Sequence, residues 1–171
     1  MKAPVKWLLN YTDLDITTDE QIHNLASEMT LSGSKVESVD KLESEIKRVV
    51  VAKCVECRRH ENSDHMFVCQ MDTGSANGGI TQIVTGAQNV REGDLVPAAL
   101  HNSYLPGGIH ITKGKLRGVP SNGMLCSGPE LDVPAGLYPH IGDEGIIEIF
   151  EEVAPGTDVK EVFGLGDDIV D

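Results

Sequence analysis

The fold of this chain is decided by residues 104–127, YLPGGIHITKGKLRGVPSNGMLCS. The stretch begins with a Pro-Gly-Gly turn. Its side chains then alternate, with Ile109, Ile111 and Lys113 on one parity and the residues between them on the other. A period of two is typical of a half-buried β-strand. Five glycines let the backbone turn sharply or another surface approach closely. The stretch therefore predicts a β-strand bounded by tight turns.

Three cations in this stretch are the first candidates for a binding surface. Lys113, Lys115 and Arg117 lie two residues apart, so one extended strand would present them on the same side. The whole chain is acidic, however, with 14 Lys and Arg against 27 Asp and Glu and a formal net charge of −13. Nucleic-acid binding draws most of its affinity from neutralised phosphates. The composition therefore argues against strong RNA binding by the chain alone.

Short strands separated by polar turns predict an all-β unit around this stretch. Besides a last, short run at 146–150, four further runs are rich in β-branched residues or alternate in polarity: 49–57, 65–72, 80–85 and 95–100. Together with the opening stretch they give five main strands. That number fits an OB-type β-barrel.

The N-terminal part predicts a separate, helical unit. Thr17 or Thr18 can cap a helix, because an acidic or amide residue three positions on completes a capping box. Residues 22–29 carry a single apolar stripe at helical spacing, and Gly33 is well placed to end the helix in a left-handed conformation. A short strand is expected at 35–39.

The C-terminal part predicts one more short helix. Thr157 is its expected cap, Val159, Val162 and Phe163 form its apolar face, and Gly164 ends it.

Cys54 and Cys57, with His60 and His65 close behind, are the candidate metal ligands. In a regular strand an offset of three places two side chains on opposite faces, roughly 10 Å apart at ~3.3 Å per residue. Neither a disulfide nor a tetrahedral metal site spans that separation. We therefore expect no metal.

Other function classes find no support in the sequence. No run of ~18 apolar residues predicts a membrane span. The N-terminus lacks the apolar core of a signal peptide, and four cysteines without secretory context indicate reduced thiols in the cytosol. Ser121, Cys126 and Ser127 lack the histidine and acid that would activate a nucleophile. We expect no catalytic residue.

A family resemblance adds to these expectations. LRGVPSNGMLCS at 116–127, followed by GPEL, resembles the LRG-x-x-S-x-GM-x-CS-x-x-EL signature of the tRNA-binding domain near the start of bacterial phenylalanyl-tRNA synthetase beta chains. Upstream, IVTGAQNV at 83–90 is similar to the family's I-V-C-G-A-x-N-V. The beginning of the chain is similar too, with a W-L-x-x-Y segment at 7–11 and G-x-x-V-E-x-V at 33–39.

The resemblance implies an α+β chain, with a five-stranded OB-type barrel inserted into a small helical N-terminal domain. Residues 1–39 and 153–171 would form the two parts of that domain, and 40–152 the tRNA-binding-type barrel. Because the family's beta chains continue for several hundred residues, it also implies that the chain is an N-terminal fragment.

For the parent enzyme, the resemblance implies attachment of phenylalanine to its tRNA in the cytoplasm. That reaction uses ATP and magnesium, in an assembly of two alpha and two beta chains whose catalytic site lies in the alpha chain. The fragment itself is expected to be inactive and to hold no cofactor. Its partners would be tRNA, the remainder of the beta chain and the alpha chain.

Any contact with tRNA should be weak, non-specific and directed at phosphates and shape, since aromatic residues are only 4% of the chain. For Asn89 a turn-stabilising role stays open, and for the three cations a merely solvated strand face. Eight residues are the expected contacts: Arg58, Arg59, Asn89, Lys113, Lys115, Arg117, Ser121 and Met124.

Two rival functions remain. One is a free-standing tRNA-binding protein. The other is a structural module that docks against the rest of the synthetase without binding RNA, which the charge of −13 supports.

Overall fold

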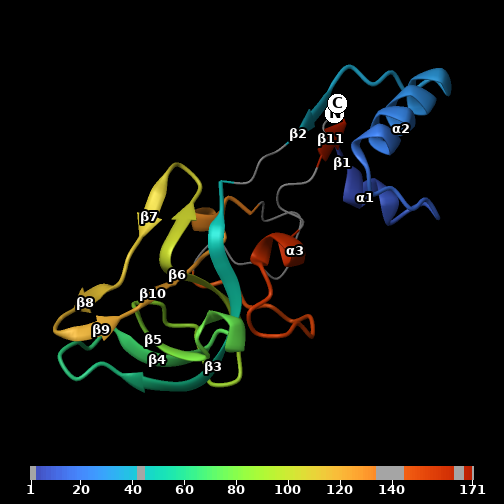
Figure 1. The fold of residues 1–171 in the computed structure, drawn as a ribbon. Coiled ribbons are helices and arrows are strands. Elements are labelled where there is room, and N and C mark those ends of the chain that lie inside the picture. The colour runs from blue at the N-terminus through green and yellow to red at the C-terminus, as the bar shows by residue number, and fades with distance from the viewer. Residues whose placement is uncertain (1–2, 42–44, 134–144, 164–167, 171) are drawn as a thin grey trace. The chain divides into compact units, whose positions relative to one another are not determined.

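The computed structural model describes residues 3–41, 45–133, 145–163 and 168–170 (Figure 1). The chain divides into two compact units, one made of residues 1–44 and 164–171, the other of residues 45–163. The larger unit is therefore inserted between two parts of the smaller one, as the resemblance implies. The division differs from the predicted boundaries because residues 153–163 belong to the larger unit.

The smaller unit combines helices with a three-stranded sheet that the sequence did not predict. The C-terminal strand β11 lies between the other two strands and is antiparallel to both. Its pairing is what joins the end of the chain to its beginning. The elements are β1 (Ala3–Pro4), α1 (Val5–Leu9), α2 (Asp19–Leu31), β2 (Val39–Lys41) and β11 (Asp168–Val170).

Helix α2 begins and ends as its sequence predicts. Thr18 is the N-cap, and the capping box is complete: the Gln21 amide N–H donates to Thr18 Oγ1 at 3.3 Å, and the Thr18 N–H donates to Gln21 Oε1 at 3.1 Å. At the other end Gly33 takes a left-handed φ of 103°. The N–H of Ser34 then reaches the Met29 carbonyl at 2.9 Å, which closes a Schellman motif.

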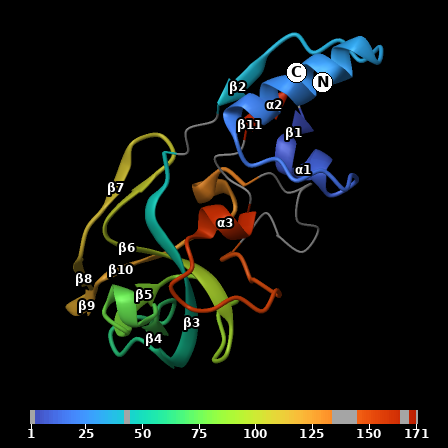
Figure 2. The ribbon, with the colours of Figure 1, turned by 45° about the vertical axis from the view of Figure 1, so that its right-hand side comes forward.

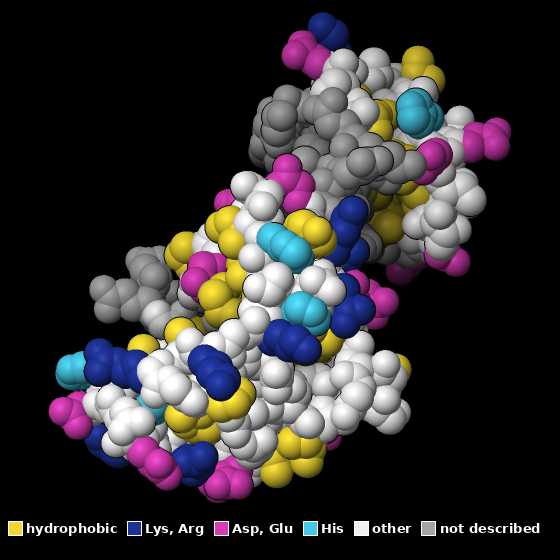
Figure 3. Space-filling view, turned by 60° about the vertical axis from the view of Figure 1, so that its left-hand side comes forward, with side chains coloured by type: hydrophobic (Ala, Val, Ile, Leu, Met, Phe, Trp, Pro, Cys, Tyr) yellow, Lys and Arg dark blue, Asp and Glu magenta, His cyan; other side chains and the backbone are white. Residues whose placement is uncertain are grey.

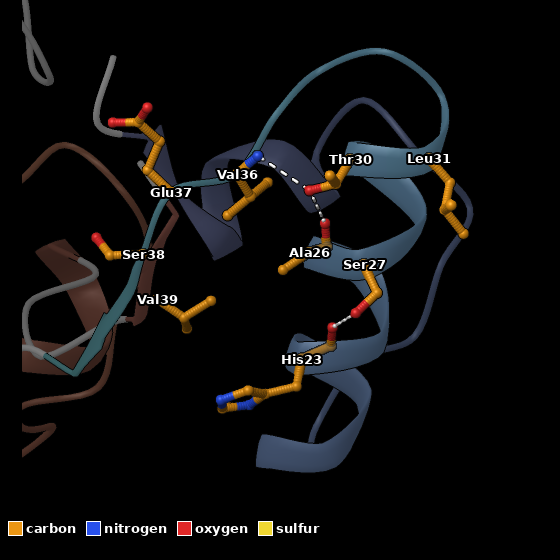
Figure 4. Close-up of a pocket in the computed structure, with 9 residues that line it drawn as sticks. All are labelled: His23, Ala26, Ser27, Thr30, Leu31, Val36, Glu37, Ser38 and Val39. Atoms are coloured by element: carbon orange, nitrogen blue, oxygen red, sulfur yellow. Dashed lines mark hydrogen bonds between the residues drawn. The ribbon is translucent and has the colours of Figure 1, made fainter.

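One side of α2 borders an open groove of about 550 Å³ in the smaller unit (Figure 4). Val36 and Val39 face Ala26 and His23 of the helix across it. Thr30 Oγ1 holds the groove's edge together, since it donates to the Ala26 carbonyl and accepts from the Val36 N–H, at 2.9 and 3.0 Å. The groove is therefore framed by hydrogen bonds rather than by packing alone.

The larger unit is a curled antiparallel sheet with the strand order β10-β6-β3-β4-β5, and β7 pairs with the far end of β6. This five-strand path confirms the predicted OB-type fold. Strands β8 and β9 pair only with each other in the sheet pattern. The strands are β3 (Lys47–Arg59), β4 (Phe67–Asp72), β5 (Ile80–Thr85), β6 (Leu95–Leu105), β7 (Ile109–Ile111), β8 (Gly114–Leu116), β9 (Val119–Ser121) and β10 (Gly123–Leu125).

Two sequence expectations are wrong in detail. Residues 104–127 form four short strands instead of one, because turns interrupt the alternation. Residues 146–150 form no strand but touch the sheet through isolated bridges from Ile146 to Ser127 and from Ile149 to Leu95. Short 3₁₀ turns at Ser75–Asn77 and Pro129–Leu131 complete the unit.

The segment before α3 (Val159–Phe163) lies along the free edge of β3. The Val51 N–H donates to the Thr157 carbonyl, and the Gly156 N–H donates back to the Val51 carbonyl, at 2.8 and 2.7 Å. These bonds explain why residues 153–163 belong to the barrel. Asp158, not the predicted Thr157, caps α3, since its Oδ1 accepts from the N–H of Lys160.

The barrel's core consists of small and medium-sized apolar side chains from all the main strands. They are Ala52, Cys54, Cys69, Met71, Ile83, Val90, Val96, Ala98, Leu125 and Ile146. Helix α3 lies on the opposite side of this unit from β7, β8 and β9 (Figures 1 and 2). Among the described residues, no helix is both long and apolar enough to cross a membrane.

Gly123 sets the distance between β10 and β6, and its replacement tests the fold. A Cβ at Gly123 would lie 2.3 Å from the Ala99 carbonyl oxygen, so Gly123→Ala should lower the free energy of unfolding by about 1–3 kcal/mol. Gly114→Ala is the matched control, because nothing lies within 4 Å of its Cβ position and its φ is not left-handed. Urea unfolding measures both. Equal stabilities would contradict the close packing of β10 on β6.

Candidate nucleic-acid interface

The hairpin of β8 and β9 presents two of the predicted cations. Lys115 lies opposite Pro120 in the pair, and Arg117 occupies the turn with a left-handed φ of 50°, followed by Gly118 at 85°. Two consecutive left-handed residues are the requirement of a tight hairpin turn. Lys113 precedes the hairpin, and all three side chains are exposed. The prediction that one continuous strand carries the three cations is therefore wrong. The three side chains are nevertheless exposed, as a binding surface requires.

A fourth cation joins them that the sequence did not reveal. Arg48 of β3 donates from Nε to the His101 carbonyl at 3.1 Å, and the Lys113 N–H donates to His101 Nδ1 at 3.0 Å. His101 thus links Arg48 to Lys113. Strand periodicity could not predict the position of Arg48, because the residue lies at a break in the strand register and has a left-handed φ of 57°. We call Arg48, Lys113, Lys115 and Arg117 the basic strip.

The composition around the strip differs from that of the chain as a whole. Between Asp94 and Glu130 the sequence contains no acidic residue, although it holds Lys113, Lys115 and Arg117. Figure 3 brings the left-hand side of Figure 1 forward. On this face of the barrel, Lys, Arg and His side chains lie near one another with hydrophobic side chains between them. The stretch itself is therefore basic, although acidic side chains from other segments border it, as Glu45 does where its Oε2 accepts from the Gly107 N–H at 2.7 Å.

An open groove of about 310 Å³ lies beside the strip, between β7, the β8–β9 hairpin, β10 and Val84 of β5. Lys115, Ser121 and Met124 line it, so the structure brings three of the predicted residues together. Ser121 is buried, however. Its Oγ accepts from the Val84 N–H at 3.0 Å and donates to the Gly123 carbonyl at 2.9 Å. Ser121 thus holds the groove's floor rather than presenting a free hydroxyl.

Within the part of the chain that the structure describes, one aromatic pair stacks beside the groove. Tyr104 and His110 face each other across β6 and β7 with ring centroids 4.5 Å apart and planes 6° from parallel. His110 lines the groove, and Tyr104 is 41% exposed.

Arg58 and Arg59 end β3 and are exposed, with different partners. Arg58 lies 3.9 Å from the Glu61 carboxylate, and the Arg59 guanidinium lies 5.9 Å from the Phe67 ring centroid. Two contacts connect the loop after them to the hairpin: Arg117 Nη1 donates to the Asn62 carbonyl at 3.3 Å, and His60 Nε2 lies 2.9 Å from the Leu116 carbonyl. The loop therefore joins the hairpin to the end of β3, although it also carries the acidic residues Glu61 and Asp64.

Asn89 has a structural position. Its Nδ2 donates to the Ile146 carbonyl at 2.8 Å, and its Oδ1 accepts from the Ile146 N–H at 3.0 Å. A Cβ on Gly145 would meet Oδ1 at 2.6 Å, so the neighbouring backbone is closely fitted to this side chain. The geometry favours the turn-stabilising role over a contact with RNA.

The three cysteines of β3 and β4 lie together, which corrects the sequence argument. The register of β3 against β4 shifts between Cys54 and Glu56, and this bulge turns Cys57 to the same side as Cys54. The Sγ atoms of Cys54, Cys57 and Cys69 all lie within 4.8 Å of one another. The predicted separation of roughly 10 Å, which assumed ~3.3 Å per residue in a regular strand, is therefore wrong.

None of the buried thiols is suited to attack a substrate. Burial, the neighbouring Cys57 and the carboxylates of Asp94 and Glu92 raise the pKa of Cys54 to about 11. Burial also raises the pKa of Cys69, and that of Cys126 to about 12. The attacking form of cysteine is the thiolate, so these raised pKa values disfavour nucleophilic attack in the metal-free chain.

The larger unit has an OB-type fold. The comparison with known proteins shows which family with this fold the chain belongs to. Residues 49–158 match the family described as a putative tRNA binding domain. The chain belongs to this family.

Full-length matches confirm the resemblance to phenylalanyl-tRNA synthetase beta chains. The chain is 46% identical over 171 residues to the phenylalanine–tRNA ligase beta subunit of Clostridium acetobutylicum, and 40% identical to that of Clostridium tetani. Both alignments include the whole of this chain. The chain itself spans only about a fifth of the length of each relative, 20% in both cases. Among solved structures, a methionyl-tRNA-synthetase-related protein from Pyrococcus horikoshii is similar at a TM-score of 0.44 and 15% identity, covering 84% of this chain and 97% of that one.

Asn89→Ala separates the structural role from the RNA role. Losing both bonds to Ile146 should lower the free energy of unfolding by about 2 kcal/mol, while the folded variant keeps its affinity for tRNA. Gln88→Ala is the control, because its exposed amide bonds only to the carbonyls of His65 and Gly86. Thermal unfolding and a tRNA titration at low salt measure the two effects. Weaker tRNA binding without loss of stability would contradict this assignment.

Proposed function

We propose that this chain is the N-terminal part of a phenylalanyl-tRNA synthetase beta chain, and that its barrel presents the basic strip to tRNA phosphates. The observation that carries the proposal is the strip itself: four exposed cations, three of which lie in the stretch of sequence between Asp94 and Glu130 that contains no acidic residue. Phosphate contacts position a nucleic acid without reading its sequence. The strip therefore serves as an accessory surface that holds tRNA.

The groove adds shape to this surface. Its volume of about 310 Å³ is at the lower end of typical ligand sites and leaves room for little more than one nucleotide unit. Lys115 lies at its side and the Tyr104–His110 stack at its rim. Of the predicted residues, Arg58, Arg59, Lys113, Lys115, Arg117 and Met124 remain proposed contacts. Asn89 and Ser121 support the surface from behind.

The proposed binding is weak. Four cations that each neutralise one phosphate give a log–log salt slope of about −3 to −4, and a dissociation constant on the order of 10⁻⁴–10⁻⁶ M at physiological salt. Acidic residues elsewhere on the chain repel the phosphates. This repulsion weakens the affinity further at low ionic strength, where it is less screened.

In the full-length protein, this barrel would be part of the cytoplasmic enzyme that attaches phenylalanine to tRNA. Its partners there would be the remaining beta chain and the alpha chain, in an assembly of two copies of each. ATP and magnesium belong to that assembly. We expect the remainder of that assembly to bind both groups.

A charge-reversal experiment tests the strip. Lys113→Glu with Lys115→Glu should weaken tRNA binding at least tenfold at low salt and reduce the magnitude of the salt slope by about 2, because two phosphate contacts are lost. Lys35→Glu with Lys53→Glu is the matched control, since it changes the net charge equally at exposed positions outside the strip. Arg117 is left unchanged because its guanidinium bonds to the loop at Asn62. Filter binding at several salt concentrations measures both pairs.

Equal binding by the two double variants would reject the strip as the contact surface. The structural docking module would then be the better description of the barrel.

The chain alone should not activate phenylalanine. The proposal assigns ATP binding to the rest of the assembly, so phenylalanine-dependent exchange of pyrophosphate into ATP should stay at background with purified 1–171 free of host synthetase. A complete synthetase assayed in parallel gives the positive control. Exchange that co-purifies with the chain and follows its concentration would contradict the assignment of catalysis to the rest of the assembly.

A further inference from the structure

The cysteine cluster at the junction of β3 and β4 has no part in the proposed tRNA contact. Cys57 and Cys69 are direct partners in the strand register, and their Sγ atoms lie 3.7 Å apart. Cys54 joins them because of the bulge, and all three sulfurs lie within 4.8 Å of one another. We propose that Cys54, Cys57 and Cys69 bind one thiophilic divalent cation of the zinc type.

The sulfur separations fit a metal better than a disulfide. Three thiolates around a tetrahedral ion at Zn–S bonds of about 2.3 Å are separated by about 3.8 Å. The Cys57–Cys69 pair already has this spacing, and the remaining sulfurs need to close by about 1 Å or less. A disulfide would instead need about 2.0 Å between the sulfurs, so Cys57 and Cys69 would have to approach by about 1.7 Å.

The surroundings of the cluster favour a cation. The turn at residues 91–94 folds over it: the Cys54 N–H donates to the Asp94 carbonyl at 2.8 Å, and the Gly93 N–H donates to the Cys54 carbonyl at 2.7 Å. This turn brings the Glu92 carboxylate to 3.4 Å from the Cys57 N–H. Carboxylates raise the local affinity for a positive ion.

The cluster also has a route of entry. Cys54 and Cys69 are buried, but Cys57 is only half-buried, and the neighbouring Glu92 is exposed. An ion can reach the sulfurs from this side, where Glu92 or a water molecule would complete four ligands.

Binding involves no oxidation. Each thiol loses its proton to solvent as its sulfur–metal bond forms, so one ion replaces three protons. Since the ligands come from both β3 and β4, the ion cross-links the strands and stabilises the folded barrel by mass action.

The experiment uses the complete chain, reduced and freed of metal, titrated with Zn²⁺ against a chromophoric chelator and with Cd²⁺ under ultraviolet absorption. We expect one equivalent of each ion, a thiolate-to-cadmium charge-transfer band, and a higher Tm with Zn²⁺. Cys57→Ser should lose the one-equivalent binding, the Zn²⁺-dependent rise in Tm and most of the band. Cys126→Ser, the matched control, should keep all three, because Cys126 is buried outside the cluster.

A second readout on the wild-type chain makes the test independent of any variant's folding. Zn²⁺ should protect three of the four cysteines from alkylation under mild denaturation. Absence of one-equivalent binding by the wild-type chain, equal binding by Cys57→Ser, or protection of none of the thiols would overturn the proposal. None of these results bears on the tRNA titrations, which depend on the basic strip.

Discussion

The architecture of the barrel depends on one constraint, the need for β3 to pair with several neighbours along its length. From Lys47 to Lys53 this strand pairs with β6, and from Lys53 to Arg59 with β4. Its backbone groups at Val51 also bond to the segment before α3. A flat, regular strand cannot pair with neighbours that run in different directions. The strand therefore bends where its register breaks.

Each of the two register breaks places side chains of a proposed site. At the first, Arg48 takes a left-handed φ of 57°, which carries its guanidinium to His101 and the basic strip. At the second, after Cys54, the extra residue changes the parity of the strand and gathers three thiols. Neither arrangement follows from regular strand geometry. Both follow from the same requirement that a closed or curled sheet be bent.

The sequence predicted the elements that local chemistry specifies. The capping box at Thr18 and the left-handed Gly33 were recognisable because a few adjacent residues determine the hydrogen bonds at each end of α2. Strand β5 at Ile80–Thr85 agrees with its predicted range for the same reason. The insertion was predicted only through resemblance, since the pairing of β11 with β1 and β2 joins residues more than a hundred positions apart.

What the sequence could not predict is long-range register. Parity arguments assume an unbroken strand, and that assumption failed at Cys54 and again at residues 104–127. Asn89 was ambiguous for a related reason, because its partner Ile146 lies 57 residues away. A side chain whose role is set by a distant backbone group carries no local signature of that role.

The acidic composition is compatible with a surface for RNA because electrostatic effects act over limited distances. At physiological ionic strength, exposed charges separated by more than about 8 Å are largely screened from one another. A phosphate beside Lys113 and Lys115 therefore responds mainly to the neighbouring strip and only weakly to acidic side chains elsewhere on the chain. In the proposed function, the net charge governs long-range approach and the strip governs contact. Such a chain should attract tRNA poorly from a distance yet hold it once another surface has brought it close, which is the behaviour an accessory module within a larger synthetase requires.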